Sequence, residues 1–285
     1  LVEWRRNLLA DRLSLTLGST IRGYRLSYLC HTVVENRAGE DVSDTKLYFA
    51  LLPYLSLDHT SESGWLSSLS LSTDQVLPPY RGMIPYNKHS STDHTVEMGQ
   101  RGLRPEYRMS ISAAVRKEWE ENHLSASLDW IGSRDYLYRY VDPDLTQDDF
   151  SEVIPRQKSA VPTDGHWSLE TICNAPFAQS LGLTLEARYK LSHLPSPLLR
   201  PIGVRLKYRL IGSDTSPVET LHYARRERIP LPGIAGHSLI SSIDYTTELW
   251  GVTVTGNYAS DRCVSVGESA SDDLYENSSL RLSTE

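Results

Sequence analysis

The segment from residue 181 to residue 211 decides the fold of this chain. It begins with LGLTLEARYK at 181–190 and, after a loop rich in proline, continues with IGVRLKYRL at 202–210. Apolar and polar residues alternate in both halves, which is typical of β-strands with one apolar and one polar face. Two such strands joined by the loop at 191–201 predict a long amphipathic antiparallel hairpin.

Charged side chains gather on the polar face of this hairpin. They are Glu186, Arg188, Lys190, Arg205, Lys207 and Arg209. On the inner wall of a membrane barrel such a cluster would bias a pore toward anions or fill the interior with salt bridges. On a soluble sheet the same residues would be a charged face in water. This cluster is the first candidate site.

The same period of two recurs along most of the chain. It is found at 24–31, 107–115 and 124–130, in a second predicted hairpin at 237–258, and in a closing strand at 274–282. We count about twelve to fourteen strand candidates, well above the usual strand content. Only residues 1–11, LVEWRRNLLAD, predict a short helical turn instead. With no change of composition along the chain, we expect a single β domain over residues 1–285.

Two long connections interrupt the predicted strands, at 73–105 and at 141–166. Connections of this length are usually functional or disordered. The second contains a group of carboxylates, namely Asp142, Asp144, Asp148, Asp149 and Glu152. Closely spaced carboxylates suit Ca²⁺, although the glycine and terminal glutamate of an EF-hand are missing. The hypotheses are therefore a weak calcium site or an acidic loop in water.

Composition excludes several classes of protein. The net charge of −7 argues against a nucleic-acid partner, which would require a basic face. The three cysteines, Cys30, Cys173 and Cys263, are far apart and without CxxC spacing, so they do not form a disulfide framework, although one long-range disulfide would suit an oxidising compartment. No stretch approaches the roughly 18 apolar residues of a membrane helix. The chain opens on Leu1 rather than Met, so we expect a mature form or a fragment.

No motif in the chain predicts catalysis. The string nearest to a nucleophile elbow, GHSLI at 236–240, lacks the second glycine and runs into a predicted strand. Nothing matches the spacing of a zinc site or a nucleotide-binding loop. We therefore predict no cofactor and favour a protein that is not an enzyme.

The strand pattern fits both a membrane barrel and a soluble sandwich, and four features favour the barrel. Strands of ten or more residues match the roughly 9–11 that cross a bilayer at a tilt. Charged residues in the middle of strands suit a polar lumen. Tyrosine is abundant at 16 residues, and together with 6 tryptophans it often falls near predicted strand ends. Connections alternate between tight, as predicted after Leu17, after Glu121 and near Thr247, and long.

Three features favour a soluble sheet. The last residues, SSLRLSTE, lack the C-terminal aromatic residue that outer-membrane barrels commonly carry. The segment at 45–57, TKLYFALLPYLSL, is a continuous apolar run with a proline, which suits a strand buried on both faces. Amphipathic sheets of soluble sandwiches also present charges to water.

Over most of its length the chain resembles outer-membrane barrels in its strand pattern, with no diagnostic motif. The resemblance implies an all-β, closed up-and-down barrel of about 12–14 strands. It would act in the outer membrane or at the cell surface as a channel, transporter or assembly component. Its partners would be the lipid bilayer and other outer-membrane or periplasmic proteins, with no nucleic acid.

Two other classes stay open at this stage. One is a secreted or surface two-sheet β-sandwich or jelly roll used for binding, such as an adhesin, a carbohydrate-binding module or a shell protein. The other is a soluble barrel, lipocalin-like or an enzyme with its active site in the mouth. Whether the leucine and tyrosine stripe contacts lipid or a second sheet separates these classes.

Overall fold

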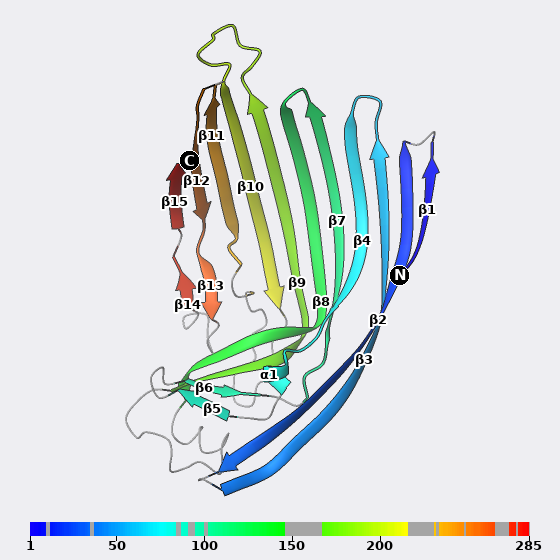
Figure 1. Cartoon of the computed structure of the whole chain (residues 1–285), viewed down its shortest axis with the longest axis vertical. Coiled ribbons are helices and arrows are strands. Elements are labelled where there is room, and N and C mark those ends of the chain that lie inside the picture. The colour runs from blue at the N-terminus through cyan, green and yellow to red at the C-terminus, as the bar shows by residue number, and fades with distance from the viewer. Residues whose placement is uncertain are drawn as a thin grey trace.

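The computed structural model shows a chain composed almost entirely of β-strands (Figure 1). It describes residues 1–9, 12–34, 37–83, 87–90, 95–99, 102–145, 167–215, 231, 234–247, 249–265, 274–277 and 279–284. The strands are β1 (Val2–Leu8), β2 (Leu13–Val34), β3 (Arg37–Thr60), β4 (Trp65–Val76), β5 (Asn87–Ser90), β6 (Thr95–Met98), β7 (Glu106–Trp119), β8 (Asn122–Leu145), β9 (Trp167–Lys190), β10 (Ile202–Thr215), β11 (His237–Thr246), β12 (Gly251–Ala259), β13 (Arg262–Ser265), β14 (Leu274–Glu276) and β15 (Ser279–Thr284). One helical turn, α1 (Tyr80–Met83), lies between β4 and β5.

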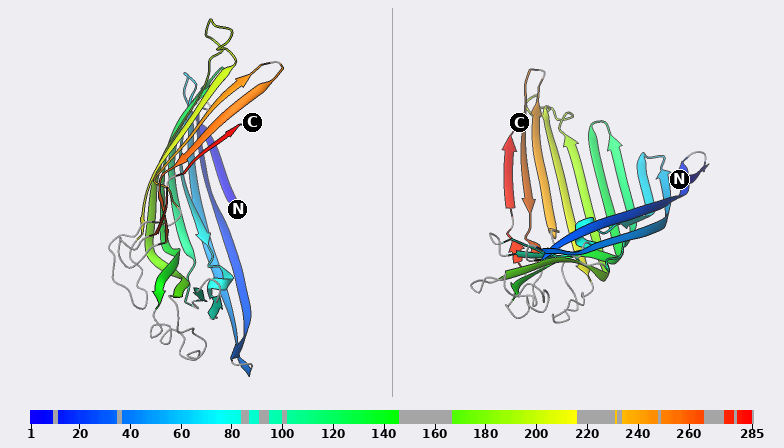
Figure 2. Two further views of the ribbon diagram at one scale, coloured as in Figure 1. Left: turned by 90° about the vertical axis from the view of Figure 1, so that its left-hand side faces the viewer. Right: turned by 60° about the horizontal axis from the view of Figure 1, so that its bottom comes forward.

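The long strands form one antiparallel sheet in up-and-down order. Their order is β1-β2-β3-β4-β7-β8-β9-β10-β11-β12-β15, and short β6 joins the sheet by pairing in parallel with β9. The edge-on view in Figure 2 shows this sheet as a curved wall. The prediction of an all-β fold of antiparallel hairpins is confirmed. Among the described residues β1 and β15 are the edges of the wall and do not pair with each other, so closure into a barrel stays a prediction.

Both predicted hairpins are present. In the first, β9 pairs with β10 from Lys190 opposite Gly203 to Ala178 opposite Thr215. In the second, β11 pairs with β12 from Thr246 opposite Gly251 to Ser238 opposite Ala259. The predicted closing strand at 274–282 is instead two strands, because β14 pairs with β13 whereas β15 pairs with β12.

The strand register carries one apolar face and one polar face across the sheet. Directly opposed residues of neighbouring strands lie on the same face, and successive residues lie on opposite faces. One row across β7 to β10 consists of Ala113, Leu128, Leu183 and Leu210, and the next consists of Ala114, Ser127, Thr184 and Arg209. The period-two pattern of each strand therefore adds up to a surface that is apolar on one side and polar on the other.

Connections at the two ends of the sheet differ in length. At one end, uppermost in Figure 1, strands are joined by tight turns or by the loop at 191–201. The turn between β7 and β8 is only Glu120–Glu121, and Glu120 has a φ of 51° as a tight hairpin requires. The other end of the sheet, where β8 ends and β9 begins, is here called the distal end. The predicted alternation of tight and long connections holds only in part, because β2 ends at Val34 and β3 begins at Arg37, so a two-residue connection lies at the distal end. Leu17 lies inside β2, and the first tight connection is between Leu8 and Leu13.

The predicted helical turn at residues 1–11 is wrong. Residues 2–8 form strand β1, which pairs with β2 from Val2 opposite Ser19 to Leu8 opposite Leu13. An isolated helix this short is marginal in water, whereas the ladder to β2 supplies a partner for the backbone. Local helix propensity is therefore overridden by strand pairing.

The first of the two long connections contains secondary structure that was not predicted. Within 73–105, β4 continues to Val76 and is followed by α1, β5 and β6. Within 141–166, β8 continues to Leu145, and residues 146–166 lie outside the described residues. The described part of the first connection thus extends β4 and adds β6, which pairs with β9.

The buried apolar residues lie toward the distal end. Met83 of α1 is fully buried, and the Tyr48 hydroxyl of β3 is 3.6 Å from its sulfur. Ala50 and Leu52 of β3, on the same face as Tyr48, are buried, whereas Phe49 on the opposite face is 72% exposed. The apolar run at 45–57 therefore serves two surfaces: even-numbered residues pack inward near α1 and odd-numbered residues face outward.

Candidate functional site

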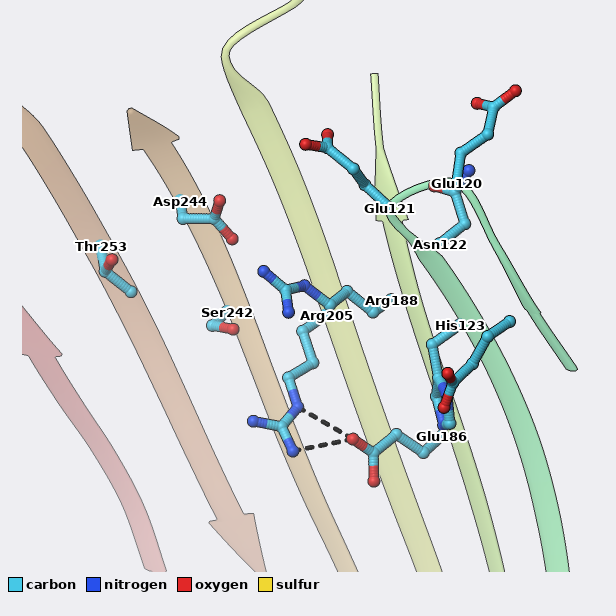
Figure 3. A pocket seen from close by; sticks show the side chains of 11 residues that line it. Glu120, Glu121, Asn122, His123, Glu186, Arg188, Arg205, Ser242, Asp244 and Thr253 are labelled. Carbon is cyan, nitrogen blue, oxygen red and sulfur yellow. Dashed lines mark hydrogen bonds and ion pairs between the residues drawn. The ribbon is translucent and has the colours of Figure 1, made fainter. Parts of the chain in front are cut away.

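A pocket of about 750 Å³ lies on the polar face near the tight turns (Figure 3). The residues that line it come from six neighbouring strands and the β7–β8 turn. They are Glu118, Glu120, Glu121, Asn122, His123, Glu186, Arg188, Arg205, Ser242, Asp244 and Thr253. The sheet brings these residues together because all but Asn122 stand on the polar face of their own strand or in the tight turn, and Asn122 directly follows that turn as the first residue of β8.

Glu186 of β9 is the centre of the ion pairs in this pocket. Its Oε1 accepts hydrogen bonds from Nε and Nη2 of Arg205 at 3.1 and 2.7 Å, shown by the dashed lines in Figure 3. Its Oε2 lies 3.5 Å from Nζ of Lys207, the residue directly opposite. One carboxylate thus pairs with two cations of β10, an arrangement stronger than an isolated surface pair.

A second set of contacts joins the β7–β8 turn to the end of β9. Lys190 Nζ lies 2.7 Å from the Glu121 carboxylate, and the Lys190 amide donates to Asn122 Oδ1 at 2.8 Å. Asn122 is only 5% exposed. His123 Nδ1 lies 3.6 Å from Glu118 Oε1 and forms an ion pair when the imidazole is protonated. The turn is therefore held against β9 by side chains as well as by the ladder.

The structure gathers most of the predicted charge cluster and adds acids to it. Glu186, Arg188, Lys190, Arg205 and Lys207 occupy neighbouring positions of the β9–β10 ladder. The sixth member, Arg209, stands opposite Thr184. Of the six, only Glu186, Arg188 and Arg205 line the pocket.

The four acids that the structure adds to the cluster could not be assigned to it from the sequence. The alternation in β7 and β11 places Glu118 and Asp244 on the polar face, and the tight turn contains Glu120 and Glu121. Only the pairing register shows that these four acids line the same pocket as Arg188. The lining has five carboxylates and two guanidinium groups, a formal charge of −3 with His123 neutral, and the paired Lys190 and Lys207 reduce this charge to −1. Fixed charge at this pocket does not favour anions, so anion selectivity stays a prediction without support from this geometry.

The weak calcium candidate falls mostly outside the described residues. Asp142 and Asp144 belong to β8, whereas Asp148, Asp149 and Glu152 are not described. In the described part of the chain no group of three or more His, Cys, Asp or Glu side chains could hold a metal ion. The calcium site stays a prediction.

The opposite face of the sheet is an exposed apolar band. Leu128, Leu181, Leu206 and Ile243 are 49%, 50%, 46% and 55% exposed, although they stand in the middle of long strands. On β10 the band runs over the nine residues of 202–210, which is about 27 Å along the strand at ~3.4 Å per residue. At a tilt of roughly 35–45° this length spans about 21 Å, close to the ~25 Å apolar band of membrane barrels.

Aromatic residues mark the tight-turn edge of this band. They are Trp65, Trp119, Tyr189, Tyr245 and Trp250. The Tyr245 and Trp250 rings lie 5.1 Å apart, and the Lys117 ammonium stands 5.4 Å from the Trp65 ring. Amphipathic rings with a nearby cation are typical of a membrane–water interface.

Beyond the other edge of the band, β8 bends at Asp135, which has a φ of 55°. Asn174 of β9 closes this bend: its Oδ1 accepts from the Arg104 amide at 2.8 Å, and its Nδ2 donates to the carbonyls of Arg104 and Asp135 at 3.0 and 2.7 Å. The Asp135 carboxylate pairs with Arg104 Nη2 at 2.6 Å. We call Asn174, Arg104 and Asp135 the Asn174 clamp. It holds the chain segment that enters β7 against the bend in β8.

Two titratable groups lie beyond the band next to the Asn174 clamp. Burial raises the pKa of the Cys173 thiol to about 12. Burial, and then the charge of Glu106, raise the pKa of the Tyr136 phenol. Cys173 packs with Tyr138 and Cys263 in a buried cluster, so neither effect indicates a reactive group exposed to solvent.

No helix in the described part of the chain is long and apolar enough to cross a membrane. No family model matches the chain, and no curated protein is similar in sequence.

Solved structures that are similar to this chain include transporters and receptors. The chain superposes on the copper transporter OprC with a TM-score of 0.67 over 97% of its length at 12% identity, and on the ferric yersiniabactin uptake receptor FyuA of Yersinia pestis with 0.60 over 96% at 13% identity. The Serratia marcescens hemophore receptor HasR, in complex with its hemophore HasA and heme, gives 0.53 over 90% at 13% identity. The chain spans only 37%, 35% and 44% of those proteins. At such identities the likeness shows the fold alone.

Proposed function

We propose that this chain is part of the wall of an outer-membrane β-barrel that takes up a solute. One observation carries the proposal: the apolar band is continuous from strand to strand and exposed, while the other face is polar and carries ion pairs. A membrane barrel requires this arrangement, with lipid outside and a polar lumen inside. The tight turns would face the periplasm, and the long connections, including those at 73–105 and 141–166, would face outside.

The band argues against a soluble sandwich. Soluble monomers rarely expose a contiguous apolar patch larger than a few hundred Å². A sandwich would need a second sheet over the band, and the described residues supply only the small β13–β14 sheet. That sheet contacts the distal end, where Cys263 of β13 packs with Tyr138 and Cys173. Lipid is therefore the partner that the band fits best.

The similar structures support uptake rather than assembly as the activity. Copper, ferric yersiniabactin and heme are the cargo of those proteins and do not identify the cargo of this chain. The complex of HasR with a hemophore supports a further proposal, that the distal end meets a partner protein outside the cell. The bilayer and other outer-membrane or periplasmic proteins would be the remaining partners.

The test is the behaviour of the chain in detergent and lipid. We expect it to require detergent or lipid to fold, and to migrate differently on gels when boiled and when not boiled, as membrane barrels do. A tryptophan placed at Leu206 should be quenched by brominated lipid chains, whereas one placed at the adjacent Lys207 should not. A folded, monodisperse protein in detergent-free buffer would overturn the proposal.

A further inference from the structure

Three charged residues that line the pocket have no partner among the described side chains. Arg205 and Lys207 share Glu186, and Lys190 pairs with Glu121. In the described part of the chain, Arg188, Glu120 and Asp244 have neither an ion pair nor a side-chain hydrogen bond. One cation and two anions thus stand unpaired in the same cavity.

Arg188 has a further reason to need an anion. It stands directly opposite Arg205 in the β9–β10 ladder. Like charges in directly opposed positions destabilise a strand pair. Glu186 relieves Arg205 by a two-nitrogen contact but makes no ion pair with Arg188. A carboxylate from outside the described chain would complete this side of the pocket.

Gly203 makes room for the Asp244 carboxylate on the polar face of β10. Asp244 of β11 stands directly opposite Gly203 of β10, and its carboxylate occupies the place that a Cβ would take. Figure 3 shows Arg188 from β9 and Asp244 from β11 extending toward each other across β10. A cavity of about 750 Å³ lies in the size range of small-molecule sites.

The formal charge of the pocket and its unpaired guanidinium and carboxylate groups indicate which ligand fits. The lining residues have a formal charge of −3, which Lys190 and Lys207 reduce to −1 by pairing with Glu121 and Glu186. A ligand with a net positive charge is therefore favoured. The opposed guanidinium and carboxylate require one anionic and one cationic group on the same molecule. A bare metal ion would leave Arg188 unsatisfied, and no three-ligand group exists among the described residues.

We infer that this pocket binds a basic amino acid or a comparably small molecule with a carboxylate and a cationic side chain. The ligand carboxylate pairs with Arg188, and its cation lies against Asp244 with Glu118 and Glu120 at the rim. The inference rests on the proposed function, because it places the polar face in an aqueous lumen that solutes enter.

The test is calorimetric titration of the full chain, folded in lipid or detergent, with L-arginine and with agmatine, which lacks the carboxylate. Arg188→Gln should weaken L-arginine about tenfold, the effect of one charged hydrogen bond, and should leave agmatine unchanged or tighter because a positive charge is gone. Asp244→Asn should weaken both ligands about tenfold. Arg209→Gln, on the same face outside the pocket, is the matched control and should change neither by more than about twofold.

Three outcomes would overturn the inference. One is no binding of L-arginine at millimolar concentration by a chain that shows heat-modifiable migration, a result that leaves the membrane proposal intact. Another is an equal loss of both ligands in the Arg188→Gln variant, which would mean that Arg188 does not contact a carboxylate. The third is binding of a basic polypeptide without binding of free L-arginine, which would make the pocket a docking site for protein.

Discussion

Replacing Leu128 by arginine tests whether the apolar band contacts lipid or a protein partner. Leu128 lies in the apolar band, six residues after the first residue of β8, is 49% exposed, and stands directly opposite Ala113 and Leu183. Its neighbour Ser127 points to the polar face, opposite Ala114 and Thr184. The two positions therefore share a backbone environment but face different surroundings.

The expected costs follow from depth in the bilayer. Arginine on the lipid face of a membrane barrel costs about 2–4 kcal/mol at the midplane and about 0–1 near the interface. Leu124 lies four residues closer to the tight turn, about 13 Å along the strand and roughly 10 Å along the membrane normal. We therefore expect Leu128→Arg to lose about 2–4 kcal/mol and Leu124→Arg at most about 1.

Ser127→Arg is the control for the substitution itself. An arginine on the polar face remains in water and lies close to Asp129, whose Oδ2 accepts from Ser127 Oγ at 3.1 Å. We expect a change within about 0.5 kcal/mol, as for ordinary surface substitutions. The assay is the free energy of unfolding in urea, measured in lipid vesicles by tryptophan fluorescence and by the gel shift on boiling.

The losses of unfolding free energy in the three arginine variants are compared with one another. A loss of 2–4 kcal/mol is a change of about 30-fold to 700-fold in the folding equilibrium and is easily resolved. Equal losses at Leu124 and Leu128 would indicate a protein partner over the whole band and refute the depth argument. A loss at Ser127 as large as that at Leu128 would refute the assignment of the two faces.

Three further predictions concern the Asn174 clamp, the buried thiol of Cys173, and the contact between Gly203 and Asp244. Asn174→Ala should lower the free energy of unfolding by about 1–3 kcal/mol, because the Arg104 backbone amide and carbonyl lose their partner, and hydrogen exchange of the Arg104 amide should speed up. Cys173, with its pKa raised to about 12, should resist alkylation at pH 8 until urea unfolds the chain. Burial of the neutral thiol also stabilises the folded state below pH 9. That contribution to the free energy of unfolding should fall as the pH rises from 9 toward 12, as measured by urea titrations. Gly203→Ala should destabilise the chain by displacing the Asp244 carboxylate, and adding Asp244→Ala should recover most of the loss in the same unfolding assay.

The sequence by itself determined the strands and their two faces. Side chains of a strand alternate with a period of two whatever it pairs with, so 181–190 and 202–210 showed both faces without knowledge of the partner strands. The six charges of the first hairpin were found for the same reason. Where local pattern was weak, as at residues 1–11, a ladder to β2 overrode the helical expectation, and no local signal could have shown that partner.

Only the tertiary structure decided which residues meet on the polar face and whether the apolar face is covered. Asp244 and Arg188 line the same pocket because β11 pairs with β10 in one register, and a shift of one residue would turn Asp244 to the apolar face. The outward exposure of Leu128 and Leu206 likewise depends on the strands standing in one sheet with no second sheet over the band in the described part of the chain. The alternation of residues is a local property of the backbone, whereas register and covering are set by contacts between residues far apart in the chain.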